Sequence, residues 1–315
     1  MKTNYPKILL TMTAAGIPIT IQTLPSRVLS AKVNIVELVA YYRNKDIYSY
    51  GVSFVSKDIA HAKCVAEIVE RIYVPNFEEG GVGVGFDKEK AQLSALYELI
   101  ERDAFMPFFL LRNIPVRRID NKIVKSILKK CEIGRLPANY TCIFFDITND
   151  LGIPSIAAYV QEKKSGLMCV GIKSNINSEI ALLGSLEEAL LEMTLKEKYG
   201  KKMKVDTRDI FSMKRFKSIF IDNTNYQTGP LPNIQTSFSG LYAYLYKRGQ
   251  SVVFMEKTPL IFKKLKYHVM VASSDTLQKV FFTTERININ KKRLENIKRY
   301  YIIMEQNHEK NSISV

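Results

Sequence analysis

Two short motifs contain the residues whose types and spacing could do chemistry. They read Glu67-Ile68-Val69-Glu70-Arg71 and Glu98-Leu99-Ile100-Glu101-Arg102. On a helix, residues three and four positions apart lie on one face, so each motif presents two carboxylates and a guanidinium together. Pairs of carboxylates bind Mg²⁺ when the ion also keeps water and phosphate oxygens as ligands. If the two helices pack side by side, the motifs predict a metal site made of Glu67, Glu70, Glu98 and Glu101.

The same spacing has a second interpretation. Glu67 with Arg71, and Glu98 with Arg102, are also i, i+4 ion pairs of the kind that stabilise exposed helices by about 0.3–0.5 kcal/mol. Under that interpretation the side chains bind no ligand. The spacing alone leaves both interpretations open.

A glycine run, Gly80-Gly81-Val82-Gly83-Val84-Gly85, lies between the two motifs and is predicted to be a loop. Glycine lets backbone N–H groups approach a ligand closely, and the N-terminus of a following helix favours anions. The run therefore predicts a cradle for nucleotide phosphates, with Gly83 and Gly85 as candidate binding residues. A tight structural turn is the alternative.

The surrounding residues predict the elements that must position these motifs. Ser56 or Asp58 can cap a helix over 59–73, and Asp87 can cap a second helix that carries the second motif and ends before Pro115. Strands are predicted at 7–12, 17–24, 33–42, 47–55, 140–147, 153–160, 167–172, 251–255 and 267–272. Further helices are predicted at 123–131, 182–199, 240–248 and 291–304, and 33–42 is also compatible with a helix.

Helices and strands are interleaved along the whole chain. This pattern predicts an α/β or α+β fold in which mixed sheets are flanked by helices. The sequence contains no low-complexity linker. We therefore expect a single domain over 1–315, with a strand-rich N-terminal part (1–56), a core that carries both motifs (57–205) and a C-terminal part (206–315).

The composition excludes several classes of site. The four cysteines (Cys64, Cys131, Cys142 and Cys169) have no CxxC spacing, and three histidines are too few for a histidine-rich metal site or a Ser-His-Asp triad. We expect the cysteines to be small core residues in a reducing cytosol. No apolar stretch reaches the length that spans a membrane. The net charge of +15 is dispersed along the sequence, so we expect a basic surface and no nucleic-acid site.

The motifs and their order resemble the signatures of the YcaO-domain family. The glycine run, Ala91 and residues 98–104 are similar to the second signature, in which a glycine-containing loop leads into an alanine-rich helix that ends Glu-apolar-apolar-Glu-Arg-Asp. Gly51, Ala62 and the first motif resemble the first signature. Residues 145–154 are similar to the strand-turn-strand that follows, and residues 185–191 to the start of the third helix. Together these segments cover most of the chain.

The resemblance implies an ATP- and Mg²⁺-dependent enzyme that activates a peptide backbone amide. Family members phosphorylate the amide oxygen while a nucleophile attacks the carbonyl carbon, which gives an azoline, a thioamide or an amidine. The glutamates of both motifs would bind metal or ATP, Gly83 and Gly85 would belong to the nucleotide site, and Arg71 and Arg102 would hold phosphates or orient the carboxylates. The resemblance also implies a peptide substrate, a separate leader-peptide-recognition or other partner protein, a homodimer and a cytoplasmic location.

The chain departs from the family pattern at several positions. The family has serine at the position of Cys64, many members have Asn and Glu at the positions of Phe86 and Lys90, and the third helix usually presents Arg and Glu at the positions of Glu192 and Lys196. Glu192 would repel a triphosphate unless a lysine compensates its charge. The segment between the first motif and the glycine run is short. These departures favour an alternative, in which the chain is an inactive scaffold that serves as a partner or regulatory subunit of a peptide-modifying complex.

Overall fold

The computed structural model describes residues 4–25, 33–74, 80–111, 114–133, 138–200, 216–221, 227–232, 240–278 and 289–312. The elements in chain order are α1 (Tyr5–Ala14), β1 (Ile19–Leu24), β2 (Asn34–Tyr42), β3 (Lys45–Ser53), α2 (Lys57–Tyr73), β4 (Gly80–Gly85), α3 (Lys88–Leu110), β5 (Arg117–Ile119), α4 (Asn121–Lys130), β6 (Tyr140–Asp146), β7 (Ser155–Glu162), β8 (Met168–Ser174), α5 (Ser178–Tyr199), the π-helical turn η2 (Lys217–Ile221), β9 (Gln227–Gly229), α7 (Leu241–Lys247), β10 (Val253–Glu256), α8 (Leu260–Lys263), β11 (His268–Ser273) and α9 (Lys291–Ser312).

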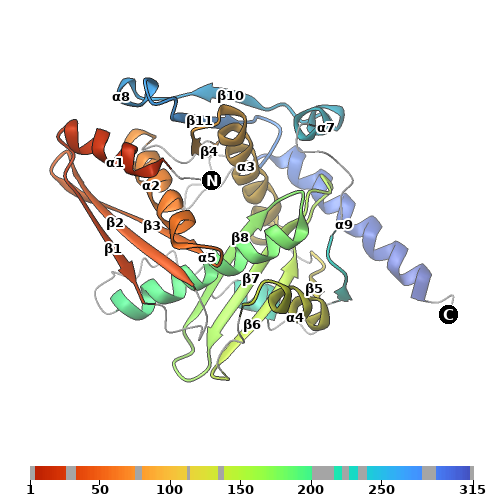
Figure 1. Cartoon of the computed structure of the whole chain (residues 1–315). Coiled ribbons are helices and arrows are strands. Elements are labelled where there is room, and N and C mark those ends of the chain that lie inside the picture. Colours follow the sequence, from red (N-terminus) through yellow and green to blue (C-terminus); the bar gives the residue numbers. More distant parts are fainter. Residues whose placement is uncertain are drawn as a thin grey trace.

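The strands form three sheets, and each sheet packs against one long helix (Figure 1). The first sheet is an antiparallel meander, β1-β2-β3, against which α2 lies. The second has the order β10-β11-β4 and packs against α3. The third has the order β8-β7-β6-β5-β9, with a single parallel pair between β5 and β9, and packs against α5. The predicted mixed α/β fold is confirmed.

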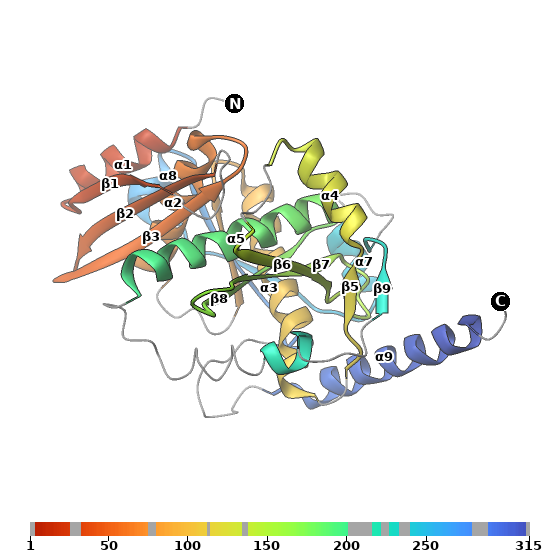
Figure 2. The ribbon, with the colours of Figure 1, turned by 90° about the horizontal axis from the view of Figure 1, so that it is seen from below.

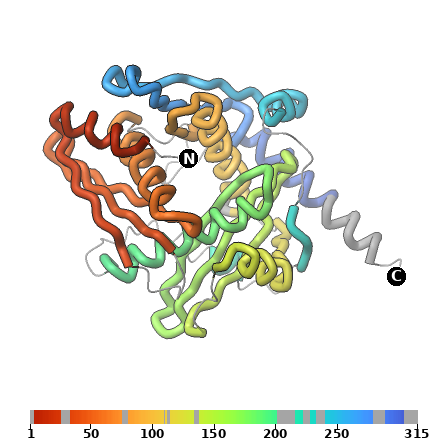
Figure 3. The backbone as a smooth tube through the Cα atoms, in the orientation of Figure 1, coloured from red at the N-terminus to blue at the C-terminus, as the bar shows by residue number. Residues whose placement is uncertain are grey.

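Segments that are far apart in the sequence lie side by side around α2 and α3. The tube in Figure 3 shows the N-terminal sheet and the β10–β11 hairpin on either side of α2. One buried apolar cluster joins them, and it includes Ile68 of α2, Val36 of β2 and Val269 of β11. Helix α9 contacts α3 and then runs away from the sheets (Figure 2). None of the helices described here is long and apolar enough to cross a membrane.

The helices that carry the motifs begin where the sequence predicted. The Ser56 hydroxyl accepts the N–H of Ile59 at the start of α2, and the Asp87 carboxylate accepts the N–H of Lys90 at the start of α3. Such caps satisfy N–H groups that have no partner within the helix. The other predicted strands and helices are present, except for two segments that are described next. Residues 33–42, which were compatible with either a strand or a helix, form the strand β2.

The first correction concerns the N-terminus. Residues 7–12 were predicted to be a strand, but they belong to the helix α1. Pro6 lies in the first turn of this helix, where its missing N–H costs nothing, and Gly16 follows the end of the helix with a φ of +79°. The apolar residues Ile8 and Met12 are four positions apart and both buried, which is a helical spacing that the strand interpretation missed.

The second correction concerns the glycine run, which is the strand β4 and not a loop. It pairs antiparallel with β11 over its whole length, from Gly80 opposite Ser273 to Gly85 opposite His268. The glycines are needed because α3 lies against this strand: a Cβ on Gly81 would be 1.9 Å from the carbonyl oxygen of Ala95. The run therefore serves close packing of helix on strand.

Candidate functional site

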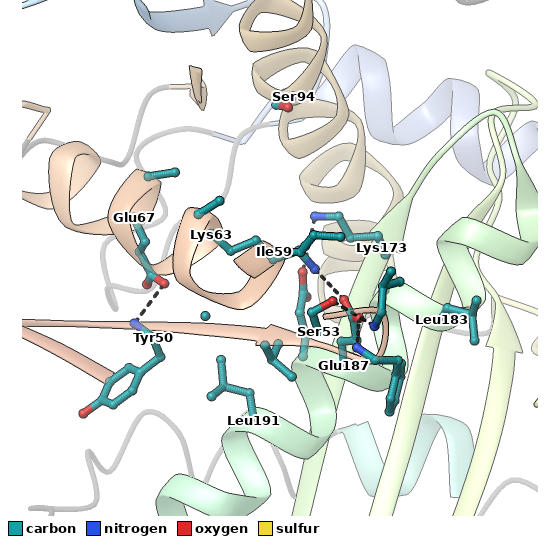
Figure 4. A pocket seen from close by; sticks show the side chains of 18 of the residues that line it. Tyr50, Ser53, Ile59, Lys63, Glu67, Ser94, Lys173, Leu183, Glu187 and Leu191 are labelled. Carbon is teal, nitrogen blue, oxygen red and sulfur yellow. Dashed lines mark hydrogen bonds and ion pairs between the residues drawn. The ribbon is translucent and has the colours of Figure 1, made fainter. Parts of the chain in front are cut away.

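A cavity of about 1530 Å³ lies between α2, α3 and α5 and the strands on which they pack (Figure 4). Both motifs reach it. The acidic residues on its wall are Glu67, Glu70, Glu98, Glu101, Glu132, Glu187 and Glu188, and the basic ones are Lys63, Arg71 and Lys173. Gly83 is also part of the wall, whereas Gly85 and Arg102 are not among the described residues that line it. The structure therefore brings together the four glutamates that the sequence proposed.

The first motif ties its helix to the neighbouring strand. Arg71 donates to Glu67 (2.5 Å) and to the carbonyl oxygen of Tyr48 in β3 (2.7 Å). Glu67 in turn accepts the backbone N–H of Tyr50 (3.4 Å). The predicted i, i+4 ion pair thus forms, and it also holds both side chains in place against β3.

The second motif repeats this arrangement on β4. Arg102 donates to Glu98 (2.6 Å) and to the carbonyl oxygen of Gly80 (2.5 Å), and Glu98 accepts the N–H of Val82 (2.6 Å). As in the first motif, the two backbone groups are two residues apart on the strand. Both interpretations of the spacing are therefore compatible with the structure, since the ion pairs form and their carboxylates also line a cavity.

A third copy of the arrangement occurs on α5 and β8, and it includes Glu192 and Lys196, two of the positions where the chain departs from the family pattern. Glu192 accepts the N–H of Val170 (3.3 Å), Lys196 donates to the carbonyl oxygen of Met168 (3.3 Å), and the two side chains form an ion pair (2.5 Å). Neither is among the described residues on the cavity wall. The lysine that the sequence required to compensate Glu192 is thus Lys196, four residues further along the same helix.

One glycine in each strand marks the same point of the repeat. Gly51, Gly83 and Gly171 each directly follow the residue whose N–H is bound by the glutamate. A Cβ on them would be 1.9, 2.0 and 2.0 Å from helix carbonyl oxygens. Each helix also contacts the strand of the next copy, since α2 contacts β4, α3 contacts β8 and α5 contacts β3. The three copies consequently form a closed ring around the cavity.

Glu70 is a carboxyl group on the wall that burial leaves poorly compensated. No hydrogen bond or ion pair joins its side chain to any residue in the described parts of the chain. Burial, and then the charges of Glu98 and Glu67, raise its pKa well above the ordinary value. A cation placed next to Glu70 would reverse this penalty. The neighbouring Glu67 also has a raised pKa, mainly from burial, although Arg71 opposes the shift.

Glu101 lies deeper in the same wall and has a cation beside it. Its side chain is 11% exposed, and burial raises its pKa to about 7 even though Lys173 lies 3.0 Å away. The charge of Glu188 adds to this rise. Elsewhere on the wall Lys63 pairs with Glu187 (2.5 Å), which also accepts the N–H of Phe54 (2.8 Å). Several buried carboxylates are thus held close together against their mutual repulsion.

The donor set fits a Mg²⁺ ion that brings further ligands with it. Among the residues described, no three acidic, histidine or cysteine side chains are arranged to hold a metal by themselves. Mg²⁺ commonly binds one or two carboxylates and completes its shell with water and substrate phosphates. The unpartnered Glu70 beside Glu98 and Glu67 suits that kind of site.

Several residues of the cavity were missed by the sequence interpretation. Lys63, Lys173 and Glu187 received no role, although a lysine in the apolar strand 168–174 is a signal that could have been used. By contrast, two departures from the family pattern lie elsewhere. Phe86 packs on the ring of Tyr267 (4.7 Å between centroids), and Lys90 is exposed and pairs with Asp87.

The remaining predictions for this region concern the cysteines and the short segment before β4. All four thiols are free, and Cys64 and Cys169 are buried as expected, while Cys131 and Cys142 are half-buried. Cys64 lies under the first motif, where burial raises its pKa to about 12. Most of the short segment, residues 75–79, lies outside the described residues.

Comparisons with known proteins agree with this geometry. Residues 73–270 match the model of a family described as YcaO cyclodehydratase, ATP- and Mg²⁺-binding, which are the predicted cofactors. The fold is similar to that of YcaO from Methanopyrus kandleri bound with AMPPCP and Mg²⁺, with a TM-score of 0.63, 14% identity, and 85% of this chain and 88% of that chain covered. It is also similar to a heterocyclase in complex with substrate and cofactor, with a TM-score of 0.65, 11% identity and 86% of this chain covered. The chain spans 52% of that heterocyclase, and no curated protein matches the sequence.

Proposed function

Because the chain belongs to the YcaO family, we propose that it binds ATP with Mg²⁺ in the cavity between α2, α3 and α5 and activates a peptide backbone amide. The reaction forms an azoline, a thioamide or an amidine, according to the nucleophile that attacks the carbonyl carbon. The observation that supports this function best is the convergence of both Glu-x-x-Glu-Arg motifs on one cavity, where Glu70 has no hydrogen bond or ion pair among the described residues.

ATP supplies a phosphoryl group that turns the amide oxygen into a good leaving group, and Mg²⁺ offsets the charge on the phosphates. The protein has to hold this charge in place. Glu70, with Glu67 and Glu98, offers the oxygen ligands. Arg71 and Arg102 fix the orientation of the two outer carboxylates, because each guanidinium is also bound to a strand carbonyl.

The cavity is larger than one small ligand requires, since pockets for such ligands are about 300–1,000 Å³. Its volume supports binding of a nucleotide together with a segment of peptide. We propose that the described elements act as one YcaO domain, that the substrate is a ribosomally made peptide, and that a separate protein recognises the leader part of that peptide. A homodimer in the cytoplasm belongs to the same proposal.

Calorimetric titration of Mg²⁺ and a non-hydrolysable ATP analogue into three proteins tests the site. The wild type is expected to bind. Glu70→Gln removes one charged oxygen without breaking a hydrogen bond, and it is expected to weaken binding by at least about tenfold, since even outer partners of metal ligands are worth about 10- to 100-fold. Glu89→Gln, on an exposed residue in the first turn of α3, is the matched control and is expected to bind like the wild type.

Equal binding by Glu70→Gln and the wild type would refute the assignment of the site. A wild type that binds no nucleotide, alone and with its partner protein added, would instead favour the inactive-scaffold alternative. Incubation of the binding-competent protein with ATP and candidate peptides, followed by mass spectrometry, then distinguishes the products. Loss of water indicates an azoline or an amidine, and replacement of oxygen by sulfur indicates a thioamide.

A further inference from the structure

Lys173 is a basic residue of the cavity wall to which the family pattern assigned no role (Figure 4). Its ammonium group lies 3.0 Å from Glu101 on α3 and 3.3 Å from Glu188 on α5. It therefore connects two carboxylates that come from two different helices. An ammonium has three N–H donors, so one donor still lacks an acceptor in the described part of the chain.

Both carboxylates are held in place by the strand that carries Lys173. Glu101 accepts the N–H of Ser174 (3.0 Å), and Glu188 accepts the N–H of Ile172 (3.2 Å). These two N–H groups belong to the residues on either side of the lysine. The two carboxylates and the ammonium are therefore all held in position by residues 172–174 of β8.

The fold also makes room for the stem of this lysine. Gly184 of α5 lies under it, and a Cβ there would be 2.8 Å from the Cγ and 3.1 Å from the Cδ of Lys173. Side chains as flexible as lysine seldom stay in one place without such packing, because ordering them costs rotamer entropy. Here the stem is confined between α5 and its own strand, and the ammonium stays with the two carboxylates.

Charge balance makes a cation at this point necessary. Among the described residues, seven carboxylates line the cavity, of which Glu67, Glu98 and Glu187 pair with Arg71, Arg102 and Lys63. Lys173 is the remaining basic side chain on the described wall. The ammonium of Lys173 forms ion pairs with both Glu101 and Glu188 and so offsets charge from two helices. A divalent ion that bridged Glu101 and Glu188 would need the same space and would displace the ammonium.

We propose that the ammonium of Lys173 takes the place of a divalent ion between Glu101 and Glu188, so that the cavity binds a single divalent ion with its nucleotide. That ion lies on the side of Glu70, where the carboxyl group has no partner among the described residues. The remaining donor of Lys173 is available to a phosphate oxygen. This inference rests on the proposed function, and it specifies how many divalent ions bind and which residue sets that number.

Counting bound Mn²⁺ by electron paramagnetic resonance, with a saturating non-hydrolysable ATP analogue, tests this inference without relying on turnover. The wild type is expected to bind one Mn²⁺ per chain. Lys173→Met frees the two carboxylates and is expected to bind two. Lys173→Arg keeps the charge and is expected to bind one, as is Lys63→Met, which removes the other lysine of the wall. Circular dichroism checks that each variant is folded.

Two Mn²⁺ ions in the wild type would overturn the inference and leave the proposed function intact. A count of one in folded Lys173→Met would overturn it as well, because the lysine would then exclude no metal. If Lys173→Met does not fold, Lys173→Gln, which also removes the charge, takes its place: a count of two supports the inference and a count of one overturns it. Failure of every protein to bind Mn²⁺ and nucleotide would overturn the proposed function itself.

Discussion

The substitution Arg293→Met gives a sharp test of how the second motif helix is anchored. The residue after that motif, Asp103, is fully buried, and Arg293 of α9 is 1% exposed. The guanidinium donates to both oxygens of Asp103, at 2.9 Å from Nε and 2.6 Å from Nη2, and to Asp150 at 2.7 Å. Asp103 also accepts hydrogen bonds from Asn149 and from the N–H of Gln278. One buried ion pair therefore joins α3, α9 and two connecting segments.

Removing one partner of a buried ion pair costs about 3–5 kcal/mol, because the other charge stays buried without compensation. The entropy of unfolding scales with length, and for 315 residues it is about 0.7 kcal/mol/K. Arg293→Met is therefore expected to lower the melting temperature by about 5–8 °C. Differential scanning calorimetry without ligand measures it. Arg299→Met, on an exposed position of the same helix, is the matched control and is expected to change the melting temperature by less than about 1 °C.

A double substitution separates the loss of the ion pair from the loss of packing. In Asp103→Leu with Arg293→Met the fully buried carboxylate is removed together with its partner, and only Asp150, which is 26% exposed, loses an ion pair. Part of the lost stability is therefore expected to return. If Arg293→Met melts like Arg299→Met, the buried pair does not anchor α3 and the reasoning is refuted. If the double variant is less stable than Arg293→Met, the hydrogen bonds of Asp103 with Asn149 and Gln278 matter more than its charge.

Three further predictions follow from the same structure. Glu70→Gln is expected to stabilise the ligand-free protein at pH 8 but not at pH 4. The pKa of Glu70 is raised in the folded protein, so this residue lowers the stability only at pH values where its carboxyl group ionises in the unfolded chain. Equal shifts of the melting temperature at both pH values would contradict this. Gly83→Ala is expected to destabilise the protein by at least about 2 kcal/mol in chemical denaturation, since its Cβ would be 2.0 Å from a helix carbonyl, whereas Gly229→Ala, with open space around it, is expected to be near neutral. Iodoacetamide at pH 8 is expected to modify Cys131, on the cavity wall, before Cys64, whose pKa burial raises to about 12; peptide mass mapping that found Cys64 modified first would contradict it.

Local signals in the sequence were sufficient for the helices that carry the site. Ser56 and Asp87 are cap residues followed by helical apolar spacing, and the structure uses both as caps. The i, i+4 spacing also predicted the ion pairs of Arg71 and Arg102. What spacing could not show is the second partner of each arginine, a strand carbonyl, since that contact depends on how the helix packs on its sheet.

The glycine run shows where local signals fail. Glycine has a low strand propensity, so the run was predicted to be a loop, yet it is a strand because β11, far along the chain, pairs with it. Lys173 and Arg293 were missed for a related reason. Each acquires its role from partners on helices that are distant in sequence, and neither has a motif of its own. The strand β4 and the roles of Lys173 and Arg293 were therefore missed because they depend on contacts between residues that are far apart in the sequence.

The ring of three helix–strand copies has a consequence for recognition. A ring with strict threefold symmetry would offer a bound molecule three equivalent orientations. ATP and a peptide are asymmetric, so a site that binds them in one orientation has to break that symmetry with side chains. The chain does so at two points of the third copy: Leu195 stands where the other copies have Glu70 and Glu101, and Lys173 adds a positive charge to its strand. If the proposed ligands bind inside this ring, the copy that differs would set their direction, while the two similar copies would supply the common framework.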